Sequence, residues 1–276
     1  MSTVDDGRPA NGGGMKDDVS IRRATLQLVL ADRTRTIDQV KRLYAVVMGL
    51  AVSSSFSDAY KVFKLKDIDS VMIGITVSEI LTLISLIGLF YLGAERMLDS
   101  KYLDITVKPP PRRMIFLFDL CSLGLVAALF IALADTLPDP ADLNAQMRPE
   151  IYFPKSQHVF LIGLMTLYVV DFIILLGQII ILYARKIIRR SPSHDASIRA
   201  HWCWILSNVI CFGIFFPFVT DPSADAIVDL LGVNRLSILL VVVHTTRFLL
   251  DYNLAFSFYY PVHALPEADG LFLDAP

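Results

Sequence analysis

Apolar residues along the chain gather in six segments of roughly bilayer-spanning length, separated by polar connections. They lie at 43–60, 70–93, 114–134, 159–183, 203–220 and 236–258. A helix needs about 20 apolar residues to cross the hydrocarbon core. All six are predicted to be helices, because an open sheet would leave backbone groups unsatisfied in lipid and the runs are too uniformly apolar for a barrel. The first and fifth segments are the weakest, since Ser53–Asp58 interrupts one and Pro217 ends the other early.

Composition supports this interpretation. Hydrophobic residues make up 54% of the 276 residues and charged residues only 19%, whereas a soluble domain carries about 25% charged residues. The net charge of −2 gives no reason to expect a nucleic-acid partner. The predicted fold class is therefore an all-α integral membrane protein, a bundle of six transmembrane helices.

Lysine and arginine are distributed unevenly between the two predicted sides of the membrane. The N-terminal tail and the connections after the second and fourth segments together carry 18 of them, against six on the other side. Positive charge is retained in the cytoplasm, so both termini are predicted to be cytoplasmic. Without the weak first span, the five positive charges of the second connection would lie outside, which favours six spans over five. We expect a multi-pass protein of a bacterial-type inner membrane.

The domain organisation follows from the same pattern. It comprises a disordered tail at 1–18, a cytoplasmic amphipathic segment at 19–42, the six-helix transmembrane domain at 43–260 and a short C-terminal tail at 261–276. Within the amphipathic segment, apolar and polar residues alternate over 26–32 well enough to keep a short strand as an alternative to helix.

Ionisable residues inside the apolar segments are the informative feature of the chain. They are Asp58, Glu79, Asp119, Asp171, His244, Arg247 and Asp251. Each costs about 2.5–3.5 kcal/mol at the centre of a membrane helix, so they must be paired or hydrated. Asp58 lies near the outer end of the first segment, where it can reach the surface. The other six form the candidate transport path or buried charge cluster.

Arg247 is the only basic side chain deep in a predicted span. Its candidate partners are Asp171 and Glu79 across helices, all three near the midplane, or Asp251 one turn along its own helix. His244, Arg247 and Asp251 are spaced to share one helix face. The carboxylates left over are expected to be protonated, hydrated or ion-binding, or else the whole set consists of interhelical ion pairs that fix packing. Asn208 in the fifth segment is expected to form interhelical hydrogen bonds.

Several classes of membrane protein have characteristic sequence features that are absent from this sequence. No lysine lies deep in a predicted span to form a retinal Schiff base, and a single deep histidine cannot make a bis-histidine haem site. Neither a zinc-protease motif nor a K⁺-filter motif occurs. We therefore expect no cofactor, no metal and no catalytic residue, and an enzyme is the least favoured class.

Two functional hypotheses remain. The first is an ion- or proton-coupled small-solute transporter or gated pore that uses the buried carboxylates and Arg247. The alternative is a signalling, effector or partner-binding membrane protein whose buried charges are structural. The expected partners are the lipid bilayer and, on the basic cytoplasmic face, anionic lipid or a soluble protein. Because six helices make a thin bundle, we also expect a homo-oligomer.

Overall fold

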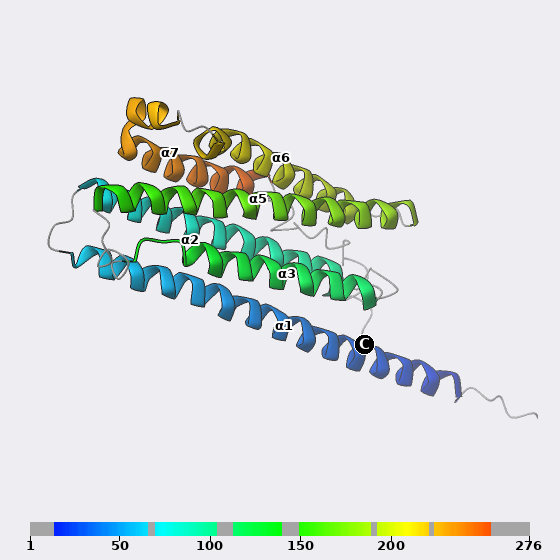
Figure 1. Ribbon diagram of the computed structural model, residues 1–276. Coiled ribbons are helices and arrows are strands. Elements are labelled where there is room, and N and C mark those ends of the chain that lie inside the picture. The colour runs from blue at the N-terminus through cyan, green and yellow to red at the C-terminus, as the bar shows by residue number, and fades with distance from the viewer. Residues whose placement is uncertain are drawn as a thin grey trace, which may run out of the picture.

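The computed structural model describes residues 14–65, 70–103, 113–139, 149–188, 192–220 and 224–254. These ranges are almost entirely helical and contain no strand. The long helices are α1 (Gly14–Phe63), α2 (Ser70–Leu98), α3 (Arg113–Ala134), α5 (Pro149–Ile188), α6 (Pro192–Thr220) and α7 (Ala224–Leu254). A π-helical turn, η1 (Asp99–Leu103), follows α2. Figure 1 shows the helices side by side, with successive helices running in alternating directions.

Four helical stretches within the described residues are long and apolar enough to cross a membrane. They are Met72–Leu103, Arg113–Ala134, Lys155–Ala184 and Ile198–Thr220, and they coincide with the second to fifth predicted segments. The first segment and the described part of the sixth, up to Leu254, are helical but do not reach this level of hydropathy. Serines lower the mean hydropathy of the first segment, and His244, Arg247 and Asp251 lower that of the sixth. The chain therefore has the helices of a multi-pass membrane protein, and the count of six spans stays a prediction.

Helix α1 is one unbroken helix of 50 residues, about 75 Å long at 1.5 Å per residue. It contains both the predicted amphipathic segment and the first apolar segment, so the two are continuous. Residues 26–32 are helical, which excludes the alternative of a short strand. Its N-terminal part extends past the other helices in Figure 1. The tails at 1–13 and 261–276 lie outside the described residues.

The bundle is held together by two closely packed helix pairs. Helix α5 packs along α6 and α2 packs along α7, while α1 contacts both α2 and α3. Small residues let α5 approach α3 closely, since a Cβ atom on Gly163 would lie 2.9 Å from Leu133 Cδ1, and one on Gly177 would lie 3.2 Å from Phe118 Cζ. Such close approach at glycine is typical of membrane helix packing.

Apolar side chains cover the outside of the bundle and polar ones are turned inward. Large aliphatic residues such as Ile173, Ile180 and Ile238 are each more than 60% exposed. Glu79 and Asp119, by contrast, are completely buried. This is the reverse of a soluble protein, and it is the arrangement that a surrounding lipid phase favours.

Lys61 anchors the C-terminal end of α1 outside the apolar interior. Its Nζ donates to Asp58 Oδ1 at 2.6 Å and to Asp139 Oδ2 at 3.3 Å, and these hydrogen bonds raise the pKa of Lys61. Asp58 thus has a partner on its own helix, three residues away, and is not part of the buried cluster.

Candidate functional site

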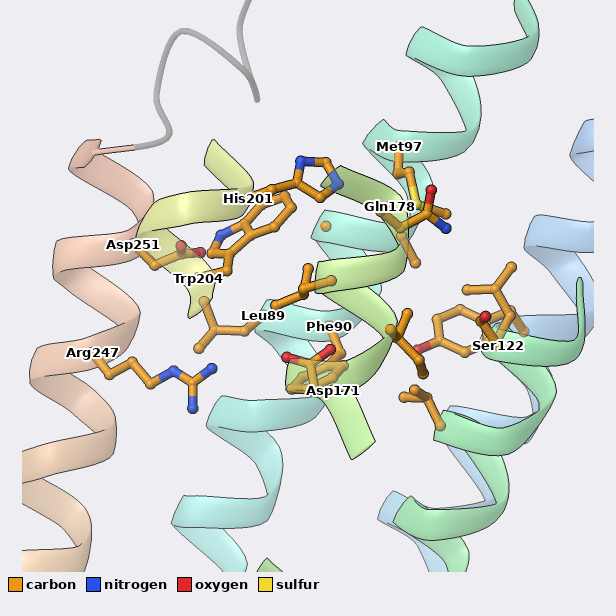
Figure 2. A pocket seen from close by; sticks show the side chains of 17 residues that line it. Leu89, Phe90, Met97, Ser122, Asp171, Gln178, His201, Trp204, Arg247 and Asp251 are labelled. Carbon is orange, nitrogen blue, oxygen red and sulfur yellow. The ribbon is translucent and has the colours of Figure 1, made fainter. Parts of the chain in front are cut away.

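A cavity of about 90 Å³ lies between the helices, towards the end of the bundle where α2 and α7 finish and α6 begins (Figure 2). All six long helices contribute to it. Its lining comprises Tyr44, Leu89, Phe90, Gly93, Ala94, Met97, Ser122, Leu123, Val126, Asp171, Ile174, Leu175, Gln178, His201, Trp204, Arg247 and Asp251. Three of the six candidate residues, namely Asp171, Arg247 and Asp251, line this one cavity.

Asn208 joins two of these charges into what we call the arginine cluster (Asp171, Asn208, Arg247 and Tyr168). Arg247 Nη2 donates to Asn208 Oδ1 at 2.6 Å, and Asn208 Nδ2 donates to Asp171 Oδ2 at 2.6 Å. The guanidinium carbon also lies 5.2 Å from the centre of the Tyr168 ring, within the range of a cation–π contact. The predicted interhelical hydrogen bonding of Asn208 is confirmed, and it connects α5, α6 and α7.

Replacing Asn208 by Leu is expected to destabilise the protein by about 3 kcal/mol or more, because two hydrogen bonds to charged groups are lost at about 1.5–3 kcal/mol each. Leu has nearly the same size, so packing is retained. Unfolding in detergent micelles measures the change. Asn253→Leu is the matched control, since the Asn253 side chain is exposed and bonds only to Leu249 O of its own helix. Equal stability of the two variants would show that the hydrogen bonds of Asn208 do not contribute to the stability of the fold.

His244 belongs to the wall of the arginine cluster and does not line the cavity. Its Nδ1 lies 2.7 Å from Leu240 O, and its Nε2 is hydrogen-bonded to the Tyr168 hydroxyl. Because a carbonyl only accepts, Nδ1 carries a hydrogen, and Nε2 of the neutral ring then accepts from Tyr168. The ring also stacks on Phe215. This environment corresponds to the packed, hydrogen-bonded histidine that is common in helix interiors.

A second buried group, the lysine cluster (Lys101, Tyr102, Asp119 and Gln178), lies beside the cavity. Lys101 Nζ approaches both Asp119 oxygens at 2.6–2.7 Å and donates to Gln178 Oε1 at 2.9 Å. Gln178 Nε2 donates to Asp119 Oδ1 at 2.7 Å, and the Tyr102 hydroxyl donates to the other oxygen. Both carboxylate oxygens of Asp119 therefore have partners within the lysine cluster, so Asp119 is not a charge partner of Arg247.

Lys101 is a second buried basic side chain, which the sequence pattern did not single out. The sequence pattern places it in a polar connection, but its side chain is only 6% exposed and it lies within the candidate span Met72–Leu103. The π-helical turn η1 carries it there, and such turns recur at functional positions in helices. No spacing in the sequence links Lys101 to Asp119.

Glu79 lies apart from the other candidates. It is fully buried on α2, and neither carboxyl oxygen has a hydrogen-bond partner among the described residues. It is ten residues before Leu89, the nearest cavity residue of α2 in sequence, or about 15 Å along the helix. Asp171 and Arg247 are connected through Asn208 and not by a direct ion pair, while Glu79 does not join them.

The cavity also contains residues that sequence reasoning did not single out, chiefly Gln178, His201 and Trp204. Polar or aromatic residues near a span end are ordinary in membrane helices, so nothing marked them in the sequence. No group of three metal-ligating side chains occurs in the described part of the chain. Comparisons with protein-family models, curated proteins and solved structures find no match for this chain.

Proposed function

We propose that the protein is a multi-pass membrane transporter or gated pore in which a small solute or ion enters the cavity and is coupled to protons through the buried carboxylates. The observation that carries this proposal is the cavity itself, which is lined by Asp171, Asp251 and Arg247 inside a bundle of apolar helices. Buried charges around a space open to water-sized molecules are the usual mark of a transport pathway in membrane proteins.

The proposed topology has six spans, with α1 and α7 completing the four clearly apolar ones. The cavity then belongs to the cytoplasmic half, because it adjoins the ends of α2 and α5, after which the lysine- and arginine-rich connections follow. Glu79 lies further toward the opposite side and is the proposed second proton site. Its burial without a hydrogen-bond partner among the described residues supports this role.

The alternative is a signalling, effector or partner-binding protein in which the charges are structural. The lysine cluster supports that alternative locally, since all its charges are paired within the protein. The projecting N-terminal part of α1 would then be the surface for anionic lipid or a soluble partner. An oligomer is compatible with both functions.

Flux measurements in proteoliposomes test the proposal. Asp171→Asn and Glu79→Gln are each expected to lower proton-coupled flux at least tenfold, because neither amide can take up and release a proton. Glu95→Gln is the matched control, since this side chain is 39% exposed, lies 3.6 Å from Lys41 and does not line the cavity. It is expected to leave flux unchanged.

Each variant must first retain the wild-type elution profile and unfolding transition. Under that condition, a wild type that moves neither protons nor monovalent cations under any imposed gradient would contradict transport and leave the structural alternative. Flux that survives both substitutions would contradict the assignment of the path to these carboxylates.

A further inference from the structure

Three side-chain oxygens deep in α2 have no hydrogen-bond partner among the described residues. They are Oε1 and Oε2 of Glu79 and Oγ1 of Thr82, and both side chains are completely buried. Residues three apart lie on one face of a helix, so the three oxygens belong to one place in the bundle. A buried polar group without a partner costs about 1–3 kcal/mol, so this place requires an explanation.

The hydroxyl of Thr82 differs from the other buried hydroxyls of α2. Thr76 Oγ1 donates to Met72 O at 3.0 Å. Ser78 Oγ donates to Ile75 O at 2.8 Å. Bonding to the preceding turn is usual for hydroxyls inside helices, but Thr82 Oγ1 forms no such bond in the described structure. Its oxygen is therefore available to a bound group, together with the Glu79 carboxyl.

Protonation of Glu79 alone does not satisfy these atoms. A protonated carboxyl still presents one O–H donor and one acceptor oxygen, and the hydroxyl of Thr82 adds a further donor and acceptor. None of them bonds to another described residue, and the two side chains do not bond to each other. A small cation satisfies all three oxygens at once, because each offers it a lone pair.

Further buried polar side chains lie at the same level of the bundle. Helices α2 and α7 run parallel in Figure 1, and a Cβ atom on Gly88 would lie 3.6 Å from Phe248 Cε2. Counting back equally along both helices from this contact places Ser237 level with residue 77, within one turn of Glu79. Ser237 Oγ accepts from Gln157 Nε2 of α5 at 3.4 Å, and both side chains are buried. Three helices therefore contribute polar groups to this part of the interior.

The chemistry of the unpartnered atoms selects the cation. All are oxygens, which suit hard cations and not soft metals. One carboxylate balances one positive charge, whereas Mg²⁺ or Ca²⁺ would leave a net charge in an apolar surrounding and require about six or more oxygen ligands. Leu83 and Leu86, on the same stretch of α2, are completely buried. Such close packing favours Na⁺ over the larger K⁺.

We infer that Glu79 and Thr82 form a sodium site within α2, with the two carboxyl oxygens and the Thr82 hydroxyl as ligands. The site is separate from the cavity, whose nearest lining residue on α2 in sequence is Leu89. The inference rests on the proposed function, in which Glu79 is the second proton site, and it names the metal cation that the same oxygens bind.

Binding of radioactive Na⁺ to the purified full chain in nanodiscs measures the site directly. The wild type is expected to bind Na⁺ saturably, with K⁺ competing about tenfold more weakly or less. Glu79→Gln is expected to abolish binding. Thr82→Val, which keeps the shape and removes the hydroxyl, should weaken binding about tenfold, the equivalent of one lost interaction with a charged group.

Thr76→Val is the matched control. Thr76 is on the same helix and only 1% exposed, but its hydroxyl already bonds to its own helix, so Na⁺ binding should be unchanged. Na⁺ should also raise the unfolding temperature of the wild type more than K⁺ or choline at equal ionic strength, because a ligand that binds the folded state stabilises it. Glu79→Gln should lose this difference.

Three results would overturn the inference. These are no saturable Na⁺ binding by the folded wild type, equal binding of Na⁺ and K⁺, and Na⁺ binding that survives both Glu79→Gln and Thr82→Val. The test also separates this inference from the proposed function. Na⁺ binding without any flux would refute transport alone, whereas proton-coupled flux through a protein that binds no Na⁺ would refute the sodium site alone.

Discussion

Replacing Lys101 by Met is expected to lower the free energy of unfolding by about 3–5 kcal/mol, the cost of leaving one partner of a buried ion pair alone. The Asp119 side chain is only 1% exposed and receives its charge compensation from Lys101. Met has a similar length, so it fills the space but leaves the carboxylate unpaired. Unfolding in mixed micelles, followed by circular dichroism, measures the loss.

Lys61→Met is the matched control for this experiment. The Lys61 side chain is 47% exposed and pairs with Asp58 and Asp139 at the surface, where ion pairs contribute at most about 1 kcal/mol. The double variant Lys101→Met/Asp119→Leu should recover much of the lost stability, because no buried charge is then left without a partner. A Lys101→Met variant as stable as Lys61→Met would show that the lysine cluster is not held together by this pair.

Replacing Arg247 by Met is expected to destabilise the protein by a similar amount, about 3–5 kcal/mol. Asp171 and Asp251 then line the cavity without the positive charge of Arg247. The Oδ1 atom of Asn208 also loses its donor, and the Tyr168 ring loses the guanidinium above it.

Arg247→Lys distinguishes charge from shape in this position. A lysine keeps the positive charge but lacks the planar fork that reaches Asn208, so it should restore roughly half of the loss. Arg35→Met serves as the control, since Arg35 is exposed on the projecting part of α1. If Arg247→Lys is as unstable as Arg247→Met, the cost comes from the lost guanidinium contacts and not from the lost positive charge.

Both predictions concern charges, and the sequence revealed only some of their partners. The pattern singled out Asp171, Asn208 and Arg247 because polar groups inside apolar segments are rare and must find one another. The depths of Asp171 and Arg247, counted along two separate segments, agree well enough to bring them together. The pattern also singled out Asp119, but its pairing with Lys101 escaped the same reasoning, because a lysine in a polar connection has no reason to be counted as buried.

For Glu79, the prediction from depth grouped residues that do not meet in the structure. Depth alone placed it with Asp171 and Arg247, since all three were counted to similar levels. The structure leaves it about 15 Å from the cavity residues along α2 and without a hydrogen bond within the described residues. Depth specifies a position along the membrane normal, whereas a contact also requires that two helices be neighbours and face one another.

The sequence by itself determined the class of protein, the helices and the residues whose burial requires explanation. Hydropathy is a local sum over neighbouring residues, and in a lipid phase such long, uniformly apolar runs must form helices. The tertiary structure decided the rest: which helices pack together, how each is rotated, and that η1 carries Lys101 into the interior. These features depend on contacts between residues far apart in the chain, such as Asp171 with Asn208. A local sequence pattern cannot predict such contacts.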